Sequence, residues 1–261
     1  MKFKLNKKNL LIGIAGLSAT LIIHFLLIGN TVYFSKSEIN EFGNPQNTLV
    51  VTPLLTANAY KSGGFYDYYK GKCKEECLTV TIDEGMPYKY SASENAIQVL
   101  KSLKYQFITD YQIHQDPSIL KQYDKVILLH SEYVTGEIFD AVTSHKNVIY
   151  LYPNALYAQV AIKDGSMTLI RGHNYENNQY PVDVSNGFGW IYDNKDQEYD
   201  NQCKDWQFIK INNGYQLNCY PEKLILKDKN LAKTLYKITT KPIHCILGEF
   251  VTWPETCKSL K

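Results

Sequence analysis

The strongest constraint on the fold is the regular alternation of short apolar stretches with amphipathic stretches along residues 48–152. Apolar, β-branched runs predict strands at 48–52, 105–109, 125–129 and 147–152. Helical apolar spacing predicts helices at 93–104 and 135–145, with a shorter helix at 116–123. Strands joined through helices pair in parallel, and runs this apolar must be covered on both faces. The order therefore predicts an α/β fold built on a parallel sheet.

Polar residues at the expected helix starts support these bounds. Ser93 is expected to cap one helix, and Asp116 stands at the cap position of the next, with a proline after it. The helix that starts at Thr135 has Glu137 in its first turn, where a negative charge favours the helix dipole. Residues 53–77 are rich in Gly, Tyr and Lys and predict a long loop before a strand at 78–82. A loop of that length in a compact domain is often functional.

The pattern changes after Pro153. Two hairpins are expected, with turns at Asp164-Gly165 and Asn213-Gly214, because such pairs adopt the left-handed conformations that tight turns need. Residues 229–238 predict a short helix. The chain from 48 to 261 is thus expected to form one α/β domain, rich in β-hairpins from about residue 154.

The amino-terminal residues predict a membrane anchor. Four lysines in residues 1–9 precede 19 residues, Leu10–Ile28, of which only His24 is titratable. A helix of that length spans a hydrocarbon core of ~30 Å, and the lysines keep residues 1–9 in the cytoplasm. Residues 29–47 are polar and predict a tether to an extracytoplasmic domain. A cleaved secretory signal is the alternative, although no clear A-x-A pattern follows the apolar run.

The six cysteines fit an extracytoplasmic domain, where cysteines usually pair. They allow fifteen pairings. Local pairing is expected because each pair brackets a short loop or hairpin: Cys73–Cys77, Cys203–Cys219 and Cys245–Cys257. Zinc is the alternative at Cys73 and Cys77, but the sequence has no second Cys/His pair nearby to complete four ligands.

Composition and motifs exclude several functions. The chain has 28 Lys and Arg against 26 Asp and Glu with no recurring basic stripe, so no nucleic-acid partner is expected. No G-x-S-x-G elbow, H-E-x-x-H pair or Gly-rich phosphate loop occurs. No cysteine stands at 130–135, which excludes a Cys nucleophile at that strand–helix junction. The sequence leaves the oligomeric state open.

Polar side chains follow two of the predicted strands. His130, Glu132 and Tyr133 leave the strand at 125–129, and Asn154 follows the strand at 147–152. In an open parallel sheet, ligands bind outside the carboxyl ends of the strands, so these residues are expected to share one crevice. Alternation along an extended chain turns His130 and Glu132 to the same side. The alternatives are a His130 that only hydrogen-bonds a strand end, a solvated Glu132 and a Tyr133 that only packs.

Five motifs in order extend this interpretation. They are "TANAYKSGGFYDYY" (56–69), "GMPYKY" (85–90), "FITDYQIHQDP" (107–117), "HSEYVT" (130–135) and "YLYPNALY" (150–157). Their order resembles the C-terminal domain of the large subunit of N,N-dimethylformamidase, over about 100 residues. The resemblance implies a flavodoxin- or glutamine-amidotransferase-like α/β fold that lacks the amidotransferase nucleophile.

The same resemblance implies a mononuclear iron held by two tyrosine phenolates and a glutamate. Carried onto this sequence, the ligands are Tyr60, Tyr88 and Glu132, with Tyr66 and Tyr90 as alternatives to Tyr88. Phenolate and carboxylate are hard oxygen donors that suit trivalent iron. His130 and Asn154 would orient substrate or water beside the metal.

The predicted function is that of a membrane-anchored, iron-dependent hydrolase of amide or related C–N bonds. Candidate substrate contacts are Tyr66, Tyr133, His173 and Asp193. The alternative function is a non-catalytic surface module with a degenerate site that binds a small molecule, a glycan, a peptide or a subunit of a membrane complex. The incomplete family pattern and the excess of tyrosine motivate that alternative.

Overall fold

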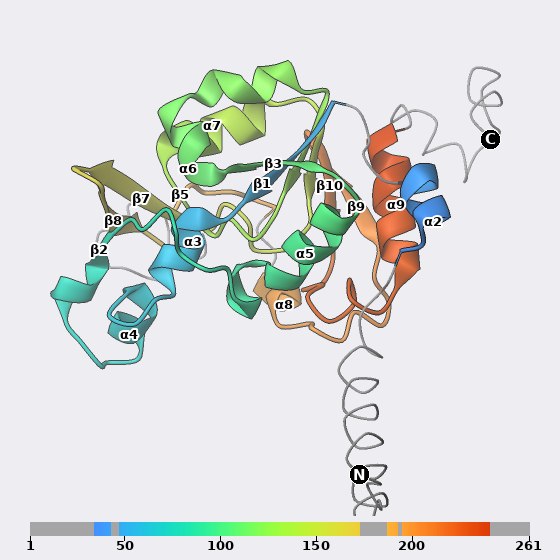
Figure 1. Cartoon of the computed structure of the whole chain (residues 1–261). Coiled ribbons are helices and arrows are strands. Elements are labelled where there is room, and N and C mark those ends of the chain that lie inside the picture. The colour runs from blue at the N-terminus through green and yellow to red at the C-terminus, as the bar shows by residue number, and fades with distance from the viewer. Residues whose placement is uncertain (1–33, 43–46, 173–186, 193–194, 241–261) are drawn as a thin grey trace, which may run out of the picture. The chain divides into compact units, whose positions relative to one another are not determined.

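The computed structural model describes residues 34–42, 47–172, 187–192 and 195–240 (Figure 1). These residues belong to one compact unit that spans 34–261. Its centre is a six-stranded sheet in the order β3-β1-β4-β6-β10-β9. The strands are β3 (Gln106–Thr109), β1 (Thr48–Thr52), β4 (Lys125–Leu128), β6 (Val148–Tyr150), β10 (Gly214–Leu217) and β9 (Phe208–Ile211). The first five run parallel and β9 pairs antiparallel with β10, so the predicted α/β fold on a parallel sheet is confirmed.

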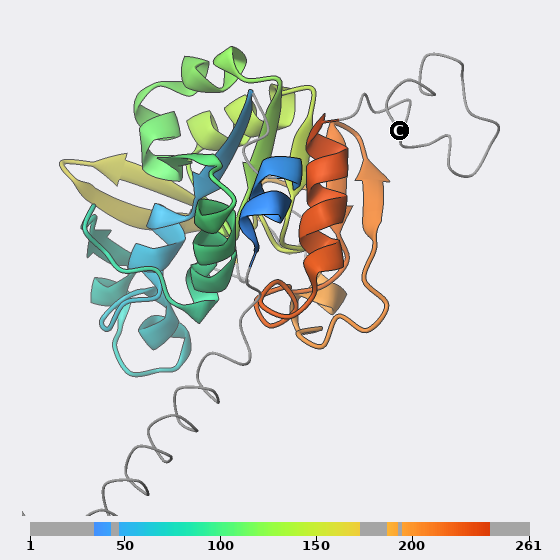
Figure 2. The same ribbon diagram turned by 45° about the vertical axis from the view of Figure 1, so that its right-hand side comes forward.

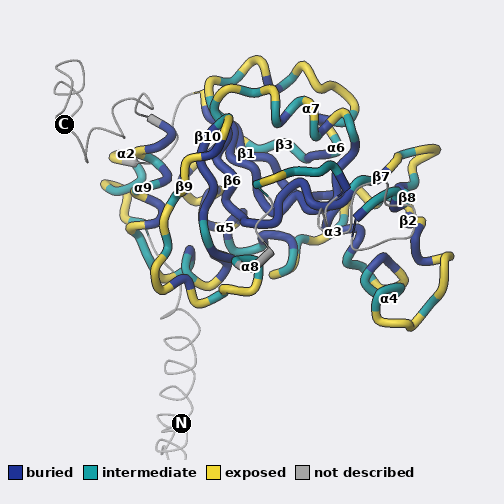
Figure 3. Tube along the Cα trace, turned by 180° about the vertical axis from the view of Figure 1, so that it is seen from behind, coloured by how far each residue is buried: buried dark blue, intermediate teal, exposed yellow. Residues whose placement is uncertain are grey.

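Alternating side chains divide the core into two layers, one on each face of this sheet. Val50, Ile127 and Ile149 are in register across β1, β4 and β6 and face helices α5 (Glu94–Ser102) and α9 (Lys229–Thr240). The neighbouring positions on each strand face α6 (Asp110–Gln115), the short helix η3 (Pro117–Gln122) and α7 (Gly136–Ser144). Figure 2 shows α5 and α9 on the same side of the sheet, and Figure 3 shows the central strands as buried.

A second, smaller sheet has the strand order β2-β8-β7-β5. Its strands are β2 (Thr79–Thr81), β8 (Ser166–Arg171), β7 (Ala158–Lys163) and β5 (Tyr133–Val134). Strands β7 and β8 form the predicted hairpin, with φ of 50° at Asp164 and 71° at Gly165 in the turn. Both angles are left-handed, as a two-residue hairpin turn requires.

The second predicted hairpin differs from expectation in register and in place. Ile211 pairs with Gly214, so the turn residues are Asn212 and Asn213, one position earlier than predicted. Strand β10 is not part of a separate hairpin layer, because it extends the central sheet through parallel pairing with β6. A Cβ at Gly214 would lie 1.7 Å from the carbonyl oxygen of Val148, so only glycine allows this approach of the two strands.

The prediction of a long loop at residues 53–77 is wrong. It contains two short helices, α3 (Leu54–Ala59) and α4 (Phe65–Tyr69), and a turn of η1 (Glu75–Leu78). All six residues of α3 are buried, so tertiary packing stabilises this short helix. The glycine and lysine residues that suggested a loop lie outside α3 and α4.

The predicted helix starts are only partly correct. Thr135 caps α7 by accepting a hydrogen bond from the backbone of Ile138, and Asp116 caps η3 through Ser118. Ser93, with a left-handed φ of 64°, does not cap α5, and its hydroxyl accepts the backbone N–H of His130 instead. The carboxylate of Glu222 replaces it and accepts the backbone N–H groups of Asn95 and Ala96.

The predicted tether is wrong over part of its length. Lys36–Phe42 form helix α2, whose start is a capping box in which Ser35 and Glu38 exchange hydrogen bonds. Glu38 also pairs with Lys229 of α9 at 2.9 Å, so the compact unit begins before residue 48. Among the described helices, none is long and apolar enough to span a membrane; the predicted anchor at 10–28 lies outside the described residues.

Two disulfide bonds are present, Cys73–Cys77 and Cys203–Cys219. They match two of the three local pairings expected from the sequence. Cys245 and Cys257 lie outside the described residues.

Candidate functional site

The candidate site lies where the strand order of the central sheet reverses. From β1 the chain passes to β3 on one side and then to β4 on the other, so their carboxyl ends diverge at a switch point. After Thr52, α3 carries the chain to Tyr60. After Leu128, the chain runs through His130 and Glu132 into β5. The topology thus brings these two segments to the edge at which α/β sheets bind ligands.

Glu132 and two tyrosines meet at this edge. The Tyr60 hydroxyl donates a hydrogen bond to Oε2 of Glu132 and lies 3.5 Å from the Tyr66 hydroxyl. Glu132 is 0% exposed, and its backbone N–H donates to Oγ1 of Thr56 at 2.9 Å, which fixes the loop on α3. Three oxygen atoms that can carry negative charge are therefore held together beneath the surface.

The surroundings hold both phenols in their protonated form. Burial raises the pKa of Tyr60 well above its ordinary value, and the charge of Glu132 raises it further. Burial, followed by the same carboxylate, raises the pKa of Tyr66 to about 12. Phenolates would form here only beside a positive charge.

His130 is held as a neutral ring. Its Nδ1 lies 2.7 Å from the carbonyl oxygen of Ser91, which can only accept, so Nδ1 carries the proton. Its backbone N–H donates to Oγ of Ser93. Burial is the main cause that lowers the pKa of His130, although the Glu132 charge opposes it. The unprotonated Nε2 faces Oε2 of Glu132 at 3.8 Å.

Asn154 joins this group from the end of β6. Its side chain is 1% exposed, and within the described part of the chain neither amide atom has a hydrogen-bond partner by distance and angle. The same holds for Nε2 of His130. The Asn154 side chain does interact with that of His130, and this interaction raises the pKa of His130. Buried polar atoms are normally paired, so atoms beside His130 that lack a well-formed hydrogen bond are suited to a bound ligand.

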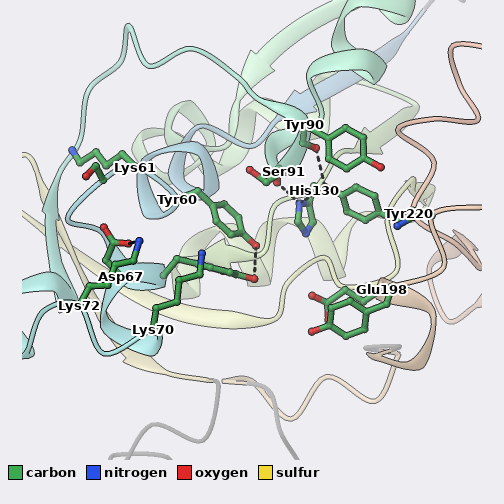
Figure 4. Close-up of a pocket in the computed structure, with 14 residues that line it drawn as sticks. Tyr60, Lys61, Asp67, Lys70, Lys72, Tyr90, Ser91, His130, Glu198 and Tyr220 are labelled. Carbon is green, nitrogen blue, oxygen red and sulfur yellow. Dashed lines mark hydrogen bonds and ion pairs between the residues drawn. The ribbon is translucent and has the colours of Figure 1, made fainter. Parts of the chain in front are cut away.

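A cavity of about 580 Å³ opens above Tyr60 and His130 (Figure 4). Figure 4 shows one wall that carries Lys61, Asp67, Lys70 and Lys72 and an opposite wall that carries Tyr90, Glu198 and Tyr220. Lys72 pairs with Asp67 at 3.3 Å, whereas the Lys70 ammonium lies 5.2 Å from the centre of the Tyr66 ring. The cavity therefore offers aromatic surfaces and a cation close to the buried oxygens.

The structure brings together only part of the predicted site. Tyr88 does not join Tyr60, because its hydroxyl lies 2.9 Å from Oγ1 of Thr52 and its ring packs in the layer that faces α5. Tyr66, predicted as a substrate contact and as an alternative ligand, occupies the position expected of Tyr88. Tyr133 is 0% exposed and packs its ring 5.1 Å from that of Phe65, and it is not among the residues that line the cavity; its role as a substrate contact stays a prediction. His173 and Asp193 lie outside the described residues.

Several residues in and around the cavity were missed from the sequence. Tyr220, which lines the cavity, and Glu222, which lies behind it, both follow β10, a strand that the pattern assigned to a separate hairpin. Had β10 been recognised as parallel, its carboxyl end would have indicated them. Tyr199 and Lys70 have no local signal, since only the folded chain brings them to the cavity.

The Tyr60, Tyr66 and Glu132 oxygens fit a hard trivalent cation better than zinc or copper, which favour nitrogen and sulfur. Among the described His, Cys, Asp and Glu side chains, no group of three could hold a metal ion, so any metal site here depends on the tyrosines. No protein-family model matches the chain, and no curated protein matches it in sequence.

Proposed function

We propose that this protein is an iron-dependent hydrolase of amide or related C–N bonds. The observation that carries the proposal is the meeting of the Tyr60, Tyr66 and Glu132 oxygens at a strand-end switch point, beneath a cavity. The dimethylformamidase resemblance and its glutamine-amidotransferase-like fold are part of the same proposal, with Tyr66 in the role first expected of Tyr88.

Iron bound by these oxygens would polarise an amide carbonyl and lower the pKa of a bound water. The Nε2 atom of His130 has a free electron pair that can accept a proton from a water beside the substrate. The Asn154 amide can donate to the substrate carbonyl, and the low exposure of both groups keeps bulk water from competing. The cavity admits a small amide, and Lys70 favours one that carries a negative substituent.

We also propose that the compact unit works outside the cytoplasm, anchored by the apolar segment 10–28. Two disulfide bonds are compatible with that location, because cytosolic thiols are usually kept reduced.

A binding module without catalysis is the competing function. It is favoured by the hydrogen bond from Tyr60 to Glu132, which satisfies the carboxylate without a cation. The two functions can be distinguished by incubating the full-length protein, with and without added iron, with small amides. Some of these amides should carry a carboxylate and others should not. Iron-dependent release of amine supports the hydrolase. Iron-loaded protein that binds these amides and releases no amine contradicts it and favours the binding module.

A further inference from the structure

We infer that Glu222 is a positioning residue that fixes the orientation of His130 and the ring nitrogen that carries its proton. This inference rests on the proposed function, in which His130 accepts a proton. Glu222 touches neither the cavity nor the three oxygens of the candidate metal site among the contacts of the described residues. Its effect would pass through the residues that enclose the imidazole.

Glu222 is a buried carboxylate with several donors. It is 0% exposed, and Oε1 accepts a hydrogen bond from the Tyr152 hydroxyl at 2.5 Å. Its two oxygens also accept the backbone N–H groups of Asn95 and Ala96, at 3.0 and 3.3 Å. The Asn95 amide donates back to the Glu222 carbonyl at 2.9 Å. A single side chain thus joins the end of β6, the start of α5 and the segment after β10.

Each of these three segments contacts His130. Tyr152 stacks on the imidazole with ring centres 5.4 Å apart and an angle of 26°. The ring of Tyr220, two positions before Glu222, lies at 89° to the imidazole with ring centres 5.2 Å apart. The Tyr220 hydroxyl donates to the Tyr90 carbonyl at 3.0 Å, so its oxygen, 3.3 Å from Nδ1 of His130, can accept from an Nδ1–H group. The segment before α5 supplies the Ser91 carbonyl that accepts from Nδ1 and the Ser93 hydroxyl that accepts from the backbone of His130.

These contacts enclose the imidazole of His130 and fix its orientation. Stacking by Tyr152 sets the plane of the ring, and the Ser91 carbonyl selects the Nδ1–H form. Nε2 is then left unprotonated on the side of Glu132 and Asn154. Without Glu222, the Tyr152 hydroxyl and the first N–H groups of α5 would lose a shared buried acceptor. The segments that contact the imidazole would then be held less firmly in place.

The test measures which ring nitrogen of His130 carries the proton. Full-length, iron-free protein with isotope-labelled histidine is compared by NMR at mildly alkaline pH with Glu222→Gln. In the unmodified protein, the Nδ1–H form should dominate. In Glu222→Gln, the ratio of the Nδ1–H to the Nε2–H form should fall about fivefold, the effect of losing one net hydrogen bond. An unchanged ratio in a folded variant would overturn the inference.

Tyr152→Phe provides a second variant in case Glu222→Gln does not fold. It keeps the ring and the cap of α5 but removes the hydroxyl that Glu222 holds, so a smaller shift in the same direction is expected. The matched control is Tyr150→Phe, since Tyr150 lies two positions earlier, is equally buried and bonds to Asn213 instead. Tyr150→Phe should leave the ratio unchanged. Equal ratios in the unmodified protein, in folded Tyr152→Phe and in Tyr150→Phe would refute the role of Glu222.

This readout needs neither iron nor a substrate. A shifted ratio in a protein that cleaves no amide would leave Glu222 as the positioning residue of His130 and refute only the proposed hydrolase. An unshifted ratio in a protein that cleaves amides would refute the role of Glu222 and leave the proposed hydrolase in place.

Discussion

The Tyr60 hydroxyl donates a hydrogen bond to the carboxylate of Glu132, although the two residues lie 72 positions apart in the chain. Tyr60 follows β1 through α3, and Glu132 follows β4, the neighbouring strand of the sheet. Their meeting is a consequence of topology, because parallel strands bring the segments after them to one edge.

Iron binding should strengthen as the pH rises. Burial and the Glu132 charge raise the pKa of both Tyr60 and Tyr66, so each phenol must release a proton that it holds firmly at neutral pH. Binding that releases protons gains affinity with pH. Competition of the protein with an iron chelator, followed between about pH 6 and pH 9 and corrected for the chelator's own protonation, measures this effect. An affinity independent of pH would mean that the phenols do not bind as phenolates.

Asp110 should make the protein less stable as the pH rises. It is 0% exposed at the amino end of α3, where it accepts the N–H of Leu55, and burial raises its pKa from 3.8 to about 7. The folded state therefore holds this proton more firmly than the unfolded state. Stability from this group is greatest below about pH 4, falls between pH 4 and 7, and is constant above; the total loss is on the order of 4 kcal/mol.

The control for this prediction is Asp110→Asn, which cannot titrate. Urea unfolding at about pH 5 and about pH 8 should show that the variant gains stability relative to the unmodified protein as the pH rises. If the difference between the two proteins is the same at both pH values, Asp110 does not titrate in this range.

Lys70 should favour ligands with a negative substituent. Its ammonium lies over Tyr66, and it has no ion-pair partner among the described residues, whereas Lys72 is paired with Asp67. Lys70→Gln should weaken binding of a carboxylate-bearing amide such as N-acetylglycine about fivefold, as expected for an exposed charge pair. Binding of neutral acetamide should not change. Lys72→Gln is the control, and an equal loss in both variants would argue for a general effect of charge.

Gly214→Ala should destabilise the central sheet. The new Cβ would meet the Val148 carbonyl at 1.7 Å, so β10 would have to move away from β6, at a cost of about 3 kcal/mol. Gly136→Ala is the matched control, because a Cβ there meets nothing within 4 Å. Thermal unfolding of the two variants compares them directly. Similar melting temperatures would contradict the parallel pairing of β6 with β10.

The sequence was sufficient for the framework of the fold because its signals are local. The apolar runs that form β1, β4 and β6 are buried on both faces. A strand that is apolar on both faces is stable only inside a sheet that is covered on both sides. The rule that ligands bind at strand ends then placed His130, Glu132 and Asn154 in one region. Helix α3 was missed because six residues are too few to show helical periodicity, even though its Leu and Ala residues favour a helix.

The details of the site could not be predicted because they depend on contacts between distant segments. Tyr66 and Tyr88 have equal chemistry, and only the side of the sheet on which each packs decides which one approaches Glu132. Glu222 was missed for a related reason. Its role requires β10 to lie beside β6, and a hairpin pattern does not show which sheet the hairpin will join.

The most direct test of the central claim, that Tyr60, Tyr66 and Glu132 together hold iron, is the visible absorption of the iron-loaded, full-length protein. The account predicts about one iron per chain and a phenolate-to-iron band that is lost in Tyr60→Phe and Glu132→Gln and weakened in Tyr66→Phe. Tyr88→Phe, whose hydroxyl bonds to Thr52, should keep the band. Loss of the band in Tyr88→Phe but not in Tyr66→Phe, or protein that binds no iron at all, would contradict the account.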